Sequence, residues 1–93
     1  MIYRSRADII SVILKSSDPG ASITKIMYNA YLSYALVKKY INFLKENQMV
    51  TYEEKTRFYK TTDKGKRFLR MHEEINKMFN SKLNKTPEFS NLS

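Results

Sequence analysis

The chain contains no cysteine, no tryptophan and one histidine, and its 93 residues include only two glycines and two prolines. Without cysteine there are no disulfides or thiolate metal ligands, as is usual for a cytosolic protein. His72 alone cannot form a set of metal ligands, and we expect it to serve in surface or interface packing. No apolar run is long enough to span a membrane, and we expect no signal peptide.

Catalytic patterns are missing as well. The sequence has no cysteine nucleophile, no Ser-His-Asp set and no glycine-rich phosphate loop. We therefore expect a protein that is not an enzyme and that uses no cofactor, metal or evident small-molecule ligand.

Positive charge is what the sequence has in excess. Seventeen Lys and Arg residues stand against nine Asp and Glu residues, which gives a net charge of +8. Residues 21–50 and residues 51–67 each carry +3, whereas residues 1–20 and 68–93 each carry only +1. Such a field attracts nucleic acid, and its concentration in the middle of the chain indicates where a phosphate backbone would be met.

Apolar residues at helical spacing predict three helices, over residues 6–16, 23–29 and 34–47. A serine precedes each helix as a candidate N-cap: Ser5, Ser22 and Ser33. Asn29 is expected to take the left-handed conformation that ends the second helix. In the third helix Val37, Tyr40, Ile41 and Leu44 form an apolar stripe, and the lysines lie mainly on the other side.

After residue 49 the periodicity changes. Residues 50–53 and 58–61 alternate between apolar and polar side chains, which predicts a β-hairpin joined by residues 54–57. A last helix is expected to begin after Thr62, a natural N-cap, and to continue to about residue 84. Gly65 near its start indicates close packing of this helix.

The order of these elements predicts a mainly α fold with a small β-hairpin, a winged helix-turn-helix followed by a long C-terminal dimerisation helix. We expect a DNA-binding domain over residues 1–67, a dimerisation helix over residues 68–85 and a tail over residues 86–93. Phe68 and Leu69 should anchor the last helix on its own domain. The other expected core residues are Ile10, Ile13, Leu14, Ile26, Tyr40, Ile41, Leu44 and Phe58.

The predicted fold also indicates which residues would meet DNA. The N-terminal half of a recognition helix contacts base edges in the major groove, and a wing lies beside the backbone or a minor groove. The expected DNA-binding residues are Ser33, Tyr34, Lys38, Lys39, Asn42, Lys55 and Arg57. Two alternatives stay open: the lysines form a solvated face, or the basic face binds an acidic protein partner. RNA is disfavoured because the sequence indicates no exposed aromatic platform.

The last helix carries apolar residues at steps of three and four beyond the part that one small domain can cover. A coiled-coil homodimer would bury this stripe. Its expected members are Met71, Ile75, Met78, Phe79 and Leu83. Alternatively, the helix ends after Glu74 and the protein is a monomer. The spacing does not determine the direction of the pairing.

Several segments resemble one family in their order and spacing. They are SRADIISVIL (5–14), TKIMYNA (24–30) with LSY (32–34), KKYI (38–41) with FL (43–44), and YKTTDKGKRFL (59–69). The chain resembles the archaeal winged-helix regulators that include small basic chromatin-associated DNA-binding proteins of thermoacidophilic archaea. The resemblance covers about residues 5–80.

The resemblance implies binding of double-stranded DNA and dimers joined by an antiparallel coiled coil of the last helices. It implies a cytoplasmic, nucleoid-associated protein that acts as a transcription regulator or as an architectural protein. The sequence departs from the family at residues 47–49, where a glycine usually follows the recognition helix. We expect Asn47 or Gln48 to make that turn instead.

Overall fold

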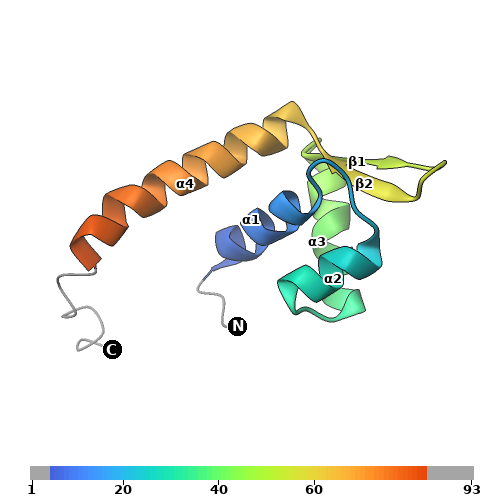
Figure 1. Cartoon of the computed structure of the whole chain (residues 1–93), viewed down its shortest axis with the longest axis horizontal. Coiled ribbons are helices and arrows are strands. Elements are labelled where there is room, and N and C mark those ends of the chain that lie inside the picture. Colours follow the sequence, from blue (N-terminus) through green and yellow to red (C-terminus); the bar gives the residue numbers. More distant parts are fainter. Residues whose placement is uncertain (1–4, 84–93) are drawn as a thin grey trace.

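The computed structural model describes the backbone of residues 5–83 and the side chains of residues 5–79. Within this part four helices and one antiparallel hairpin follow one another, as Figure 1 shows. The predicted fold class, a mainly helical winged helix with a small hairpin, is confirmed. The elements are α1 (Arg6–Ser16), α2 (Ile23–Ala30), α3 (Tyr34–Glu46), β1 (Val50–Glu53), β2 (Phe58–Thr61) and α4 (Asp63–Leu83).

The predicted N-caps are confirmed. The side-chain oxygens of Ser5, Ser22 and Ser33 each accept a hydrogen bond at 3.2 Å from the backbone N–H three residues further along. Thr62 accepts one from the N–H of Gly65 at 3.1 Å. Each bond satisfies an N–H in the first turn that has no partner within its own helix, and so determines where the helix begins.

The turn between α2 and α3 differs from the prediction. Asn29 was expected to adopt the left-handed conformation, but it lies inside α2, and Tyr31 adopts this conformation with φ 56° and ψ 42°. The helix continues because Ala30 is fully buried in its last turn. After α3, Gln48 has φ 61°, so the expectation that Asn47 or Gln48 replaces a glycine is confirmed.

The hairpin packs one face on the helices. Tyr52 pairs with Tyr59 in the antiparallel register, and Ala21 forms an isolated β-bridge to Tyr59 through two backbone hydrogen bonds of 3.0 and 2.8 Å. Tyr59 is 6% exposed and belongs to the core. The prediction that Phe58 is a core residue is wrong, because successive strand residues point to opposite faces and Phe58 is 39% exposed.

The hydrophobic core lies between α1, α2, α3 and the hairpin. Two predicted members, Ile10 and Tyr40, are only partly buried at its edge. Phe68 and Leu69 pack against it, as predicted. The buried core residues are Ile13, Leu14, Ala21, Ile26, Val37, Ile41, Leu44, Val50 and Tyr59.

Helix α4 starts at the base of the hairpin, passes over α1 and extends beyond the domain (Figure 1). A Cβ atom on Gly65 would lie 2.6 Å from the carbonyl oxygen of Met49, which confirms the predicted close packing. Further along, the Nε2 atom of His72 lies 3.0 Å from Oδ1 of Asp8 on α1. No helix within residues 5–83 is long and apolar enough to cross a membrane.

Candidate nucleic-acid interface

Helix α3 is held by its apolar side. Val37, Ile41 and Leu44 are fully buried, so the opposite side of the helix is open to solvent. Asn42 is exposed on that side. This arrangement presents a polar surface from a firmly packed helix, and rigid helices position binding groups more accurately than loops.

One flank of α3 faces the hairpin. The Nζ atom of Lys45 lies 5.9 Å from the centre of the Tyr52 ring on β1. Asn42 and Lys38 precede Lys45 by three and seven residues and therefore lie on the same flank. We call Lys38, Asn42 and Lys45 the hairpin-side flank. Lys38 is half-buried, more enclosed than the sequence indicated, and its neighbours on this flank are exposed.

Lys39 lies further around the helix, on the side of α1. It lines a hollow of about 240 Å³ between α1 and α3, together with Arg6, Ile10, Leu36, Tyr40 and Phe43. Adjacent helix residues point about 100° apart, so the structure does not bring Lys38 and Lys39 onto one surface. The predicted basic face is thus divided into two flanks, and only one of them continues toward the hairpin.

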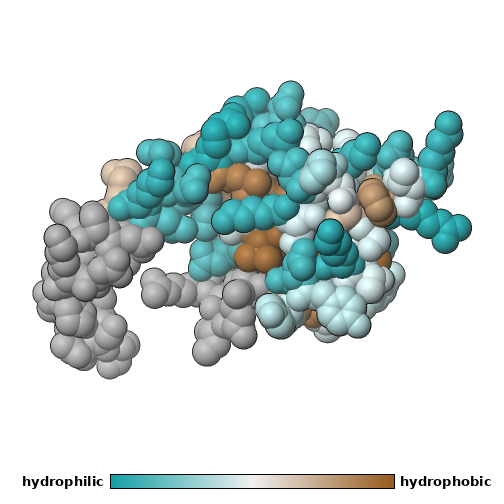
Figure 2. Space-filling model, in the orientation of Figure 1, coloured by the Kyte–Doolittle hydropathy of each residue, from teal (hydrophilic) through white to brown (hydrophobic). Residues whose placement is uncertain are grey.

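The tip of the hairpin carries two exposed cations, Lys55 and Arg57. Arg57 adopts φ 61° in the loop, and its N–H donates to the carbonyl oxygen of Glu53 at 2.8 Å. Neither side chain forms an ion pair with the residues that the structure describes. Figure 2 shows strongly hydrophilic side chains projecting at this end of the molecule.

Next to the loop of the hairpin, one acidic side chain is neutralised. Glu53 lies 3.1 Å from the Nζ atom of Lys60 and accepts a hydrogen bond from Thr56 at 3.0 Å. These two hydrogen bonds and the charge of Lys60 lower the pKa of Glu53 from its ordinary value. The carboxylate is thereby compensated within the hairpin, so that it opposes an approaching anion less than a free carboxylate would.

The comparisons with known proteins agree with this architecture. The model of the winged helix-turn-helix family matches residues 3–80. The chain belongs to this family. Its structure is similar to that of Sso10a-2, a DNA-binding protein from Sulfolobus solfataricus, with a TM-score of 0.77 and 26% identity over 96% of each chain. A search of curated proteins found no significant match. The resemblance proposed from the sequence is confirmed.

In this winged helix, α2 and α3 form the helix-turn-helix and the β1–β2 hairpin forms the wing. Ser33 begins the recognition helix, and its side-chain oxygen is engaged by the N–H of Leu36. Tyr34 is 53% exposed, in the first turn of α3. The structure thus spreads the predicted site residues from the start of α3, along its two flanks, to the tip of the wing.

Sequence reasoning missed two exposed aromatic side chains in the helix-turn-helix. Tyr28 is 77% exposed and Tyr31 is 72% exposed. Helical periodicity could have revealed Tyr28, because it lies two residues from the buried Ile26. Lys45 was also missed as a neighbour of the wing, since only the tertiary structure brings it to Tyr52.

The predicted dimer stripe lies on α4 from Met71 onward. Its four described members are between 49% and 69% exposed: Met71, Ile75, Met78 and Phe79. Leu83 ends the helix, and its side chain lies outside the described residues. Within residues 5–79 no group of three or more His, Cys, Asp or Glu side chains is placed to hold a metal ion.

Proposed function

We propose that this protein binds double-stranded DNA, with α3 in the major groove and the wing beside the backbone or in an adjacent minor groove. The observation that carries the proposal is the continuity of the hairpin-side flank with the wing tip. Lys38, Lys45, Lys55 and Arg57 extend along this surface, and none of them forms an ion pair within the described residues. Cations that are not paired with an acidic side chain are suited to the phosphates of a duplex.

Two further observations support DNA as the partner. The net charge of +8 attracts a polyanion at long range. The structurally similar Sso10a-2 is described as a DNA-binding protein. In the proposed complex Asn42 and Tyr34 face base edges, because Asn pairs with adenine and an aromatic ring can contact a thymine methyl group. Lys55 and Arg57 contact the backbone.

Lys39 has a different part in this proposal. Because it lies on the α1 side of α3, it would meet the phosphates on the other wall of the groove that α3 enters. A recognition helix with cations on both flanks is attracted to both strands. Lys39 would therefore add affinity that does not depend on sequence.

We also propose that two chains pair through α4. Its 21 residues extend about 31 Å at 1.5 Å per residue, and from Met71 onward it exposes four large apolar side chains. Pairing with a second α4 would remove them from water. An antiparallel dimer would hold two DNA-binding domains apart, which suits either a transcription regulator or a nucleoid-associated architectural protein.

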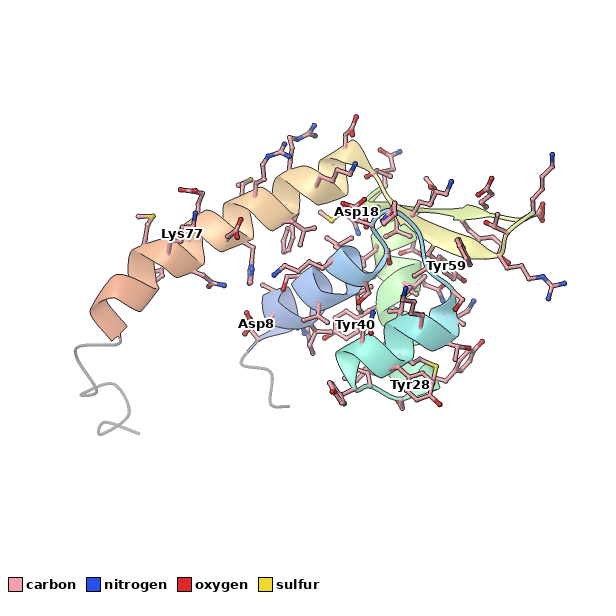
Figure 3. All side chains as sticks on the ribbon, viewed as in Figure 1. Asp8, Asp18, Tyr28, Tyr40, Tyr59 and Lys77 are labelled. Atoms are coloured by element: carbon pink, nitrogen blue, oxygen red, sulfur yellow. The ribbon has the colours of Figure 1, made fainter. Side chains whose placement is uncertain are left out.

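The test of DNA binding is a titration of random duplex at several salt concentrations. Replacing Lys38 and Lys39 together with Ala should weaken binding and reduce the slope of log affinity against log salt by about 0.9 for each phosphate contact that is lost. Lys77→Ala is the matched control, because Lys77 lies on the outer half of α4, far from the wing (Figure 3). If the double variant keeps the affinity and slope of the wild type, α3 is not the DNA-binding surface.

Sedimentation equilibrium tests the dimer. The wild-type protein should have about twice the chain mass of 11.0 kDa. Ile75→Glu combined with Phe79→Glu places like charges in the seam and should yield the monomer. A wild-type mass of 11.0 kDa at tens of micromolar would reject the dimer. Selection from a random DNA pool then separates a regulator from an architectural protein, because only the regulator enriches one sequence.

A further inference from the structure

The corner between α2 and α3 exposes three tyrosines: Tyr28 on α2, Tyr31 in the turn and Tyr34 at the start of α3. Their exposed fractions are 77%, 72% and 53%. They follow one another at intervals of three residues around one tight turn. We call them the turn tyrosines. Three large aromatic side chains exposed on a single turn form an apolar patch, and such patches on folded proteins mark sites of interaction.

Tyr31 is unusual in its backbone as well. Its φ of 56° lies in the left-handed region, where glycine or asparagine is favoured and a bulky residue is disfavoured. The ring is mostly in solvent, so packing within the described chain does not offset this cost. A residue that is unfavourable for the turn and is not used by the core is a candidate for contact with another molecule.

The location of the turn tyrosines indicates which molecule they contact. Tyr34 opens the recognition helix, and the wing follows the other end of that helix. Figure 3 shows Tyr28 at the edge of α2 that faces away from α4. Lys25, three residues before Tyr28 on α2, is exposed beside it and forms no ion pair among the described residues. The corner is therefore continuous with the proposed DNA surface and shares its positive charge.

We infer that two of the turn tyrosines, Tyr28 and Tyr31, are a second contact to the same duplex, on the backbone at the opposite end of α3 from the wing, while Tyr34 faces the bases. Each of these two phenols would donate its O–H to a phosphate oxygen, while the ring packs against the adjacent sugar. No hydrogen bond within the described residues uses these hydroxyl groups. This inference rests on the proposed function, since it requires that α3 enters the groove.

Such contacts have a diagnostic property. Neutral phenols release no counterions, so they add affinity without changing the salt dependence, whereas each lysine that meets a phosphate changes the slope. A hydrogen bond from a neutral donor to a charged acceptor contributes about 1.5 kcal/mol or more, which is roughly a tenfold change in affinity. Tyr28→Phe combined with Tyr31→Phe should therefore weaken duplex binding by about tenfold or more and leave the salt slope at the wild-type value.

Tyr31→Asn supplies a second and opposite readout. Asparagine tolerates the left-handed conformation, so this variant should melt a few degrees higher than the wild type and yet bind duplex several-fold more weakly. A purely structural role for Tyr31 could not produce both effects. Tyr59→Phe is the control, because it removes a hydroxyl group from a tyrosine that is buried.

The outcomes separate this inference from the proposed function. If the tyrosine variants bind duplex as the wild type does while the Lys38 and Lys39 double variant is weakened, the inference fails and the proposed function stands. If the wild type does not bind duplex, both fail. If the variants lose binding to a single-stranded oligonucleotide and not to duplex, base stacking replaces the backbone contact and the inference is again overturned.

Discussion

Replacing Gly65 with alanine tests how α4 joins the domain. The new Cβ atom would lie 2.6 Å from the carbonyl oxygen of Met49 and 2.7 Å from Cγ2 of Thr61, so α4 must shift by about 0.8 Å to reach ordinary contact at 3.4 Å. Neither neighbour can easily give way. The Met49 oxygen accepts a hydrogen bond from the N–H of Thr62 at 2.9 Å, and the Thr61 hydroxyl donates to the carbonyl of Leu14 at 2.6 Å.

Two effects of this substitution oppose each other. Alanine gains up to about 1 kcal/mol over glycine in a helix, and overpacking costs about 1–3 kcal/mol. The steric cost should prevail because two atoms lie under 3.0 Å and one of them is backbone. We expect a net loss of about 1–2 kcal/mol, which lowers the melting temperature by roughly 4–8 °C per kcal/mol in a domain of this size.

Gly20→Ala is the matched control. A Cβ atom there would lie 3.4 Å from side-chain atoms of Lys60 and Phe58, which is ordinary contact with movable groups. This variant should be stabilised by about 0.4–1 kcal/mol through the lower entropy of the unfolded chain. Thermal unfolding followed by circular dichroism, at equal protein concentration, measures both. If Gly65→Ala melts at or above the wild type, α4 does not pack on the base of the wing as described.

Three further predictions address the recognition helix, the wing and α4. Leu44→Ala should lower the free energy of unfolding by about 2–5 kcal/mol, whereas Asn42→Ala should leave the melting temperature nearly unchanged and weaken DNA binding. If Asn42→Ala destabilised the protein and Leu44→Ala weakened only DNA binding, α3 would be rotated about its axis relative to this structure. Glu53→Gln should remove a part of the stability that is present above pH 4.5 and is lost as the pH falls through the lowered pKa of Glu53, because Lys60 favours the charged carboxylate only in the folded state. Chemical denaturation at pH 7 and pH 3 measures this contribution. An unchanged pH dependence of the variant's stability would contradict the prediction. His72→Ala should cost about 1 kcal/mol and increase hydrogen exchange along α4, because the contact with α1 is lost; exchange at the wild-type rate would show that this contact does not hold α4.

The elements and the caps could be predicted because their causes are local. A serine before a helix bonds an N–H only three residues away, and helical periodicity is visible within a dozen residues. The wrong predictions concern residues whose burial depends on segments that are far apart in the sequence. Whether Phe58 or Tyr59 faces the core depends on the pairing of Ala21 with Tyr59, which joins segments 38 residues apart.

The candidate site could be predicted as a set of residues, but its geometry could not. Charge and element order located Lys38, Lys39, Lys55 and Arg57 on α3 and the wing. The sequence did not show that Lys39 faces α1 while Lys38 faces the wing, since this depends on the rotation of α3 about its axis. That rotation is set by which side chains the other elements bury.

The sequence by itself determined the winged-helix order, the helix starts and the basic character of the middle of the chain, because periodicity, capping and charge are properties of short segments. Only the tertiary structure decided which tyrosines are exposed and which flank of α3 continues into the wing. Tyr31 illustrates the difference. Continuation of α2 to bury Ala30 places Tyr31 in the left-handed conformation, and packing of the core leaves its ring in solvent. Such an outcome depends on how all the helices share one core, which no local pattern records.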